Sequence, residues 1–155
     1  EITETAIVCD FDQARDALAA FHALGVRTAL DDFGTGHSSL SHLRLLPLDK
    51  LKIDASFVSD IEHNPASEDI VRTVLQLGRN LRMECVIEGV ETEAQRDRVA
   101  ALGATVMQGY HFARPMPAET VPGYLTGEAV SAARRRHARA TDAAEWEGDP
   151  RREAG

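Results

Sequence analysis

Residues 28–40 read TALDDFGTGHSSL, and this stretch limits which fold the rest of the chain can form. It continues the apolar run VRTAL (residues 26–30), which predicts a buried β-strand that ends at two adjacent acids, Asp31 and Asp32. Adjacent carboxylates repel each other, and a glycine-rich segment has a large conformational entropy to lose on folding. Both features therefore call for a compensating partner at the end of this strand.

The combination of a helix and a strand that ends in a polar residue recurs along the chain. Apolar periodicity predicts helices at residues 11–24, 66–82 and 92–102. Short apolar runs predict strands at residues 26–30, 50–54, 83–87 and 104–107, with EITE at residues 1–4 as a candidate fifth. Strands that alternate with helices indicate an α/β fold with a parallel sheet and right-handed crossovers.

Polar side chains stand at the carboxyl end of every one of these four strands. They are Asp31, Asp32, Asp54, Glu88 and Gln108. In parallel α/β folds, ligands and chemistry collect at that edge, in barrels and in open sheets alike. Any single acid there is explained as well by capping of the next helix, but the same placement at every strand end favours one shared site.

The length of 155 residues allows one domain with a substantial core, whereas a (β/α)₈ barrel needs about 250. We therefore expect the later part of a TIM-type barrel whose N-terminal strands are missing from this chain. A complete open five-stranded sheet is the alternative. Residues 1–125 are expected to form the folded part. Residues 126–155, charged and rich in Ala and Arg, are expected to be a disordered tail.

Charge and cysteine content restrict the possible partners. The formal net charge of −8, from 25 acids against 17 bases, argues against a nucleic acid polymer as the main partner. Cys9 and Cys85 lack any metal-type spacing, so free thiols in a cytoplasmic protein are expected. No apolar run reaches the roughly 18 residues of a membrane span, although upstream segments could tether the parent protein to the inner membrane.

If the strand ends converge, the acids need positive counter-charges. Two like charges 4 Å apart repel by about 4 kcal/mol at an effective dielectric constant of 20. Lys52 supplies one positive charge, and divalent cations would have to supply the rest. Oxygen ligands without cysteine or clustered histidine favour Mg²⁺ or Mn²⁺ over zinc. Two such ions suit the in-line hydrolysis of a phosphoester.

Five motifs follow one another along residues 1 to about 125: EITET, LDDFGTGHSSL, LKIDASFV, VIEGVET and MQGYHFARP. In this order and at these intervals they resemble the later motifs of the EAL-domain phosphodiesterases. That family hydrolyses the bacterial second messenger cyclic di-GMP to linear pGpG on a modified TIM-type barrel. The resemblance implies the same metal-dependent reaction for the parent domain, with two Mg²⁺ or Mn²⁺ ions.

The resemblance also implies roles for individual residues. Glu1, Asp31, Asp32 and Glu88 would be the metal ligands. Glu88 would alternatively act as the base on the attacking water. Lys52 would contact that water or the phosphate, and Asp54 would complete this side of the site.

The remaining roles concern the substrate and the supporting loops. Gln108 would position water or substrate, and Arg114 would lie where the family closes its pocket. Glu4 would hold the DDFGTGHSS loop, with a plain surface acid as the alternative. Glu91 would support Glu88, unless it only caps the helix that begins near Thr92.

The chain departs from the family pattern in three respects. His37 stands where tyrosine is usual, and Ile87 stands where a smaller alanine is usual. The name-giving Glu-Ala-Leu motif and a metal-binding asparagine would lie upstream of Glu1, so we expect the 155-residue chain alone to hydrolyse little or nothing. The parent is expected to be a homodimer, with a sensory or diguanylate cyclase domain upstream.

Two other functions fit part of the pattern. A catalytically silent EAL-like module would bind cyclic di-GMP or a protein partner, although the acids, Lys52 and Gln108 are all present. A phospho-acceptor signalling domain also combines paired acids with a lysine. Its lysine would be expected on a late strand, whereas Lys52 follows Asp31 and Asp32 by one strand.

Overall fold

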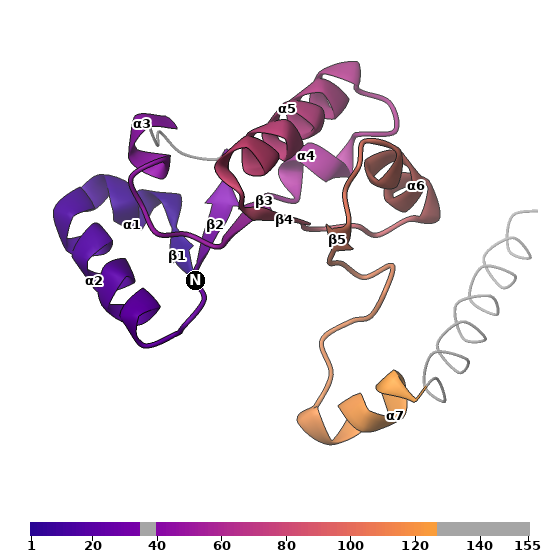
Figure 1. Cartoon of the computed structure of the whole chain (residues 1–155). Helices are drawn as coiled ribbons and strands as arrows, with labels where there is room; N and C mark the ends of the chain where they lie inside the picture. The colour runs from indigo at the N-terminus through magenta and orange to yellow at the C-terminus, as the bar shows by residue number, and fades with distance from the viewer. Residues whose placement is uncertain (35–39, 127–155) are drawn as a thin grey trace, which may run out of the picture. The chain divides into compact units, whose positions relative to one another are not determined.

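The computed structural model describes residues 1–34 and 40–126, so His37 and the tail from residue 127 lie outside the described residues. Backbone contacts divide the chain into two units, residues 1–114 and 115–155. The first unit holds the strands β1 (Ile2–Thr3), β2 (Ala29–Phe33), β3 (Lys50–Ile53), β4 (Glu84–Ile87) and β5 (Val106–Met107). All neighbouring pairs are parallel, which confirms the predicted sheet and its fifth strand (Figure 1).

Helices connect these strands, and local sequence signals set their ends. The first unit contains α1 (Glu4–Cys9), α2 (Phe11–Ala23), α3 (Leu40–Leu43), α4 (Ser56–Ser59), α5 (Pro65–Leu81) and α6 (Glu93–Ala101). Asn64 accepts a hydrogen bond from the Ala66 N–H and so caps α5, which then begins with a proline. The second unit contains the 3₁₀ helix η1 (Ala118–Thr120) and α7 (Val121–Leu125). The three long predicted helices are confirmed to within two residues at each end.

The strand order is β1-β2-β3-β4-β5, the same as the order in the chain. A doubly wound open sheet reverses its strand order at a switch point, and this sheet does not. With right-handed crossovers, a consecutive order puts all connecting helices on one face, as in a (β/α) barrel. Among residues 1–34 and 40–126, no helix is long and apolar enough to cross a membrane.

The main core lies between the sheet and α5, which packs against β3 and β4 (Figure 1). Leu51, Ile53 and Ile87 are fully buried on the helix-covered face. They meet the buried stripe of α5, which includes Val71 and Leu75. Full burial of one such side chain stabilises the fold by about 1.5–3 kcal/mol, so this layer holds the strand ends firmly in place.

One local prediction was wrong in detail. Residues 26–28 do not extend β2, because Thr28 instead donates its N–H to Asp49 Oδ2 at 2.7 Å. The apolar stripe of α2 is only partly buried, since Leu18 is 4% exposed but Phe21 is 50% and Leu24 is 78% exposed. Periodicity identifies the apolar face of a helix. It does not predict how much of that face other elements of the fold cover.

Candidate metal-binding active site

The site lies at the carboxyl edge of the sheet, on the face opposite the helices. Side chains alternate along β3, so the buried Leu51 and Ile53 point toward α5 and Lys52 points to the other face. Lys52 pairs in register with Val86 on β4, and Glu88 follows two residues later on the same face. The face that the helices leave uncovered is therefore where these charged side chains meet.

Lys52 is the centre of the charge cluster. Its Nζ lies 2.7 Å from Asp31 Oδ1, 3.0 Å from Glu88 Oε1 and 3.2 Å from Glu1 Oε2. The Lys52 side chain is only 11% exposed. Burial by itself lowers the pKa of Lys52, but hydrogen bonds to Asp31, Glu88 and Glu1 outweigh it and raise that pKa above its ordinary value. Lys52 therefore carries a firmly held positive charge.

A β-bulge brings the two adjacent aspartates to the same site. Leu30 pairs with Leu51, but Phe33 pairs with Ile53, so β2 has one residue more than β3 over this interval. Asp32 takes up the extra residue with a left-handed backbone, φ 54°. Phe33 then occupies the helix-facing position that Asp32 would have in a regular strand. Asp31 and Asp32 can therefore both face the uncovered side.

Oxygen atoms of Asp31, Asp32 and Glu88 all lie within 4.8 Å of one another. Three carboxylates at this separation form an all-oxygen donor set, which suits Mg²⁺ or Mn²⁺. Lys52 contacts two of them and leaves several of their lone pairs available, since an ionised carboxylate accepts at about four sites. The arrangement therefore fits divalent cations, and Glu1 contacts the same lysine without belonging to this group of three.

Asp54 and Gln108 follow β3 and β5 at the same edge of the sheet. Asp54 directly follows β3 and accepts the Ser56 N–H at 2.9 Å. Hydrogen bonds from Ser56, chiefly from its side chain, lower the pKa of Asp54 despite partial burial. The Gln108 N–H donates to the Ile87 carbonyl at 2.7 Å, and its own carbonyl accepts from Val90 at 3.1 Å. The backbone of Gln108 is thus fastened on both sides of Glu88.

The supporting residues occupy more varied positions. Glu4 is 3% exposed, and its Oε2 accepts the Gly34 N–H at 3.1 Å. Glu91 is exposed and donates its N–H to Gln95 Oε1, while Thr92 rather than Glu91 caps α6 in a capping box with Gln95. Arg114 lies over the Tyr110 ring, 4.3 Å from its centre. Glu4 thus contacts the start of the loop after Phe33, and the cap position of α6 belongs to Thr92 and not to Glu91.

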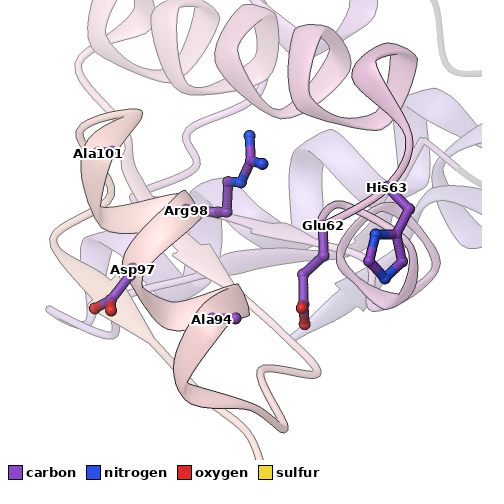
Figure 2. Close-up of a pocket in the computed structure, with 6 residues that line it drawn as sticks. All are labelled: Glu62, His63, Ala94, Asp97, Arg98 and Ala101. Atoms are coloured by element: carbon purple, nitrogen blue, oxygen red, sulfur yellow. The ribbon is translucent and has the colours of Figure 1, made fainter.

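Sequence reasoning missed two features near the site. Phe57 packs against Gly34 at the end of β2, and no periodicity in the sequence signals that contact. A hollow beside α6 is lined by Glu62, His63, Ala94, Asp97, Arg98 and Ala101 (Figure 2). Its charged groups are already engaged, because Glu62 accepts from Thr92 and Arg98 donates to Glu68. The hollow includes none of the carboxylates around Lys52.

The sequence is similar to known proteins over most of its length. The model of the EAL domain matches residues 1–115. A signaling protein of Caulobacter vibrioides is 48% identical over 126 residues, 81% of this chain and 16% of that protein. The bifunctional diguanylate cyclase/cyclic di-GMP phosphodiesterase MucR of Pseudomonas aeruginosa is 44% identical over 119 residues, 77% of this chain and 17% of that protein. The chain thus spans about a sixth of these relatives.

Solved structures resemble the chain in fold as well as sequence. The MucR phosphodiesterase in complex with c-di-GMP matches with a TM-score of 0.74 and 42% identity, over 77% of this chain and 49% of that one. The EAL domain of Mycobacterium smegmatis DcpA gives 0.76 and 39%, over 82% and 57%. Klebsiella pneumoniae BlrP1 in a manganese/cy-diGMP complex gives 0.69 and 39%, over 73% and 29%.

Proposed function

The chain belongs to the EAL-domain family, and on that premise we propose that it supplies the metal-binding side of an active site that hydrolyses cyclic di-GMP to pGpG. The observation that carries the proposal is the cluster around Lys52. One lysine contacts three carboxylates, those of Glu1 before β1, Asp31 in β2 and Glu88 after β4. The last two join Asp32 in a group whose oxygens lie within 4.8 Å. The chain is part of the TIM-type barrel of this family, with a consecutive parallel sheet.

In this proposal, two Mg²⁺ or Mn²⁺ ions are held by Asp31, Asp32, Glu88 and Glu1. When bound, such ions neutralise the phosphate charge and make a water molecule a better nucleophile. The donor set supports this assignment because it contains only carboxylate oxygens. An anionic dinucleotide would otherwise be repelled by a chain of net charge −8.

The other polar residues act on water and substrate. Lys52 offers a fixed positive charge to a phosphate oxygen or to the attacking water, because its burial and three acidic neighbours keep it in place. Glu88 accepts the proton from that water if it is not occupied as a ligand. Asp54, which its neighbours keep ionised, completes this side, and Gln108 orients water or substrate beside Glu88.

More distant residues shape the pocket. Arg114 is stacked on Tyr110, so a flat cationic pair stands after β5 and can meet the substrate at the closed end of the pocket. Glu4 holds the start of the loop after Phe33 through the Gly34 N–H. Glu91 supports the turn after Glu88, in which Gln95 also takes part.

The proposed hydrolysis requires a complete domain, of which this chain is a part. The chain covers 49% of the solved MucR phosphodiesterase, so we assign turnover to the complete domain and expect the 155-residue chain alone to hydrolyse little. MucR is named as both a cyclase and a phosphodiesterase. A parent of the same kind would form a homodimer and carry a sensory or diguanylate cyclase domain.

The test measures pGpG release from cyclic di-GMP by chromatography, with Mg²⁺ or Mn²⁺ and with a chelator. The complete domain is expected to release pGpG only with metal, and Asp31→Asn is expected to abolish release. Asp12→Asn is the matched control, because Asp12 is an exposed acid of α2. Binding of cyclic di-GMP without hydrolysis by the complete domain would refute the enzymatic proposal and leave the silent module as the reading.

A further inference from the structure

Gly34 is held from two sides at the end of β2. Its N–H donates to Oε2 of Glu4 at 3.1 Å. On the other side the Phe57 ring lies so close that a Cβ on Gly34 would meet Cε2 at 2.6 Å and Cζ at 2.7 Å. The ring fills the space where any other residue would place its side chain. The Gly34 backbone is therefore held between the Glu4 carboxylate and the edge of the Phe57 ring, and we call these two contacts the grip on Gly34.

The two contacts of this grip come from the βα units on either side of β2. Glu4 is 3% exposed and begins α1, directly after β1. Phe57 lies in α4, and its N–H donates to the Asp54 carbonyl at 3.2 Å directly after β3. The Phe57 side chain also packs against the main core, so its position is set by the fold. The grip therefore ties the end of β2 to the elements that follow the strands on both sides of it.

The end of β2 needs such support because its backbone is unusual. Asp32 has φ 54° and Gly34 has φ 102°, so two left-handed residues lie on either side of Phe33. The left-handed conformation is less favourable for aspartate than for glycine, so contacts of the neighbouring residues help to fix it. Asp31 is fixed by Lys52 at 2.7 Å, on the incoming side of the bulge. The grip on Gly34 supplies the corresponding restraint on the outgoing side.

We propose that Phe57 is a positioning residue, whose ring keeps the bulge in the form that presents the Asp31 and Asp32 carboxylates together to divalent cations. The inference rests on the proposed metal-dependent function and adds a residue that touches neither metal nor substrate. Phe57 acts through the backbone of Gly34, and Glu4 acts through the same residue from the opposite side.

The test compares Phe57→Leu with Phe21→Leu in the full chain, with the fold checked by circular dichroism. Phe21 is the matched control, because it is a half-exposed phenylalanine on α2. Calorimetric titration with Mn²⁺ is expected to show affinity about tenfold lower for Phe57→Leu, in the range seen when outer-shell partners of metal ligands are removed. Equal Mn²⁺ affinity in Phe57→Leu and the unsubstituted chain would overturn the proposal.

A second variant reaches the same contact from the backbone. Gly34→Ala pushes a methyl group against the Phe57 ring in a conformation that alanine adopts poorly, so it is expected to weaken Mn²⁺ binding as well. Unchanged affinity in that variant would also count against the grip.

Hydrogen exchange separates this inference from the proposed function. Without metal, the Gly34 amide is expected to exchange faster in Phe57→Leu than in the unsubstituted chain. The smaller side chain no longer presses the Gly34 backbone toward Glu4, so the hydrogen bond between them opens more often. If the unsubstituted 155-residue chain binds no Mn²⁺, the metal-dependent function is wrong for this chain. The exchange rate of the Gly34 amide alone then decides the role of Phe57. An unchanged Gly34 exchange rate would refute it.

Discussion

Lys52 lies 2.7 Å from Asp31 Oδ1 and is buried among carboxylates, so its ammonium group balances part of the negative charge of the cluster. Replacing it by methionine keeps the volume of the side chain and removes the charge. We expect Lys52→Met to lower the free energy of unfolding of the metal-free chain by about 1–3 kcal/mol, since its partners lose their donor. Urea unfolding measures this.

Lys50→Met is the matched control for that variant. Lys50 pairs with Glu84, but the two side chains are 30% and 43% exposed, so the pair contributes less than about 1 kcal/mol. Mn²⁺ is expected to raise the melting temperature of Lys52→Met more than that of Lys50→Met, because the ion replaces the lost positive charge. Equal responses to Mn²⁺ would contradict the role given to Lys52.

Replacing Asp32 is expected to weaken metal binding more than it changes the stability of the metal-free chain. Asp32→Asn keeps a residue that tolerates φ 54° and removes one of two adjacent negative charges. The free energy of unfolding of the metal-free variant should differ from that of the unsubstituted chain by no more than about 1 kcal/mol, the usual size of such charge effects. Its affinity for Mn²⁺ should fall. Calorimetry and urea unfolding together check this, and a variant that binds Mn²⁺ normally would remove Asp32 from the ligand set.

The capping box of α6 gives a stability prediction independent of metal. Thr92 accepts the Gln95 N–H at 3.0 Å and donates to Glu62 at 2.8 Å. Thr92→Ala should cost about 1 kcal/mol of unfolding free energy. Thr73→Ala in the exposed middle of α5 should cost little or nothing, since alanine favours helix. A similar loss in both variants would show that the cap has no special weight.

Gly78 and Cys85 make a contact that a double-mutant cycle can test. A Cβ at Gly78 would overlap the Sγ atom of Cys85, so Gly78→Ala should destabilise the fold by about 1–3 kcal/mol despite the higher helix propensity of alanine. Cys85→Ala opens the space, and the double variant should recover much of the loss. Additive losses in chemical unfolding would exclude this steric explanation.

Asp60 predicts how stability depends on pH. Hydrogen bonds from Asn64 and then from Ser67 lower the pKa of Asp60, because they favour its ionised form. A lowered pKa in the folded state stabilises the fold above the unfolded value of about 3.9, and this contribution is lost as the pH falls through the folded value. Asp60→Asn should therefore lose less stability between pH 5 and pH 3 than the parent chain.

Ser67→Ala checks the cause of that pH dependence. The Ser67 hydroxyl donates to Asp60 Oδ1 at 2.7 Å, so its removal should give a pH dependence between those of the parent and Asp60→Asn. Urea unfolding at several pH values provides the comparison. A pH profile of Ser67→Ala identical to that of the parent would leave Asn64 as the sole cause.

The sequence predicted the sheet and its polar edge because both follow from local patterns. Asp31, Asp54 and Glu88 each end an apolar run, and a parallel sheet must gather such ends at one edge. The bulge at Asp32 was not predictable in detail, since it depends on the register between β2 and β3. The contact of Phe57 with Gly34 depends on two segments that are far apart in the chain.

The extent of burial was also beyond the sequence. Phe21 and Leu24 fit the apolar stripe of α2, yet both are at least half exposed, because the stripe does not encode what packs against it. The chemical roles of Glu1, Asp54, Gln108 and Arg114 remain predictions.

The matching of strand order to chain order has a consequence for how the protein is made. A ribosome releases β2 after β1 and β3 after β2, so each new strand emerges when its hydrogen-bonding neighbour is already outside the exit tunnel. The acids near Lys52 are then recruited one at a time, and Glu88 completes the group last. Vectorial synthesis thus adds the last carboxylate, Glu88, only after the lysine that contacts it has emerged.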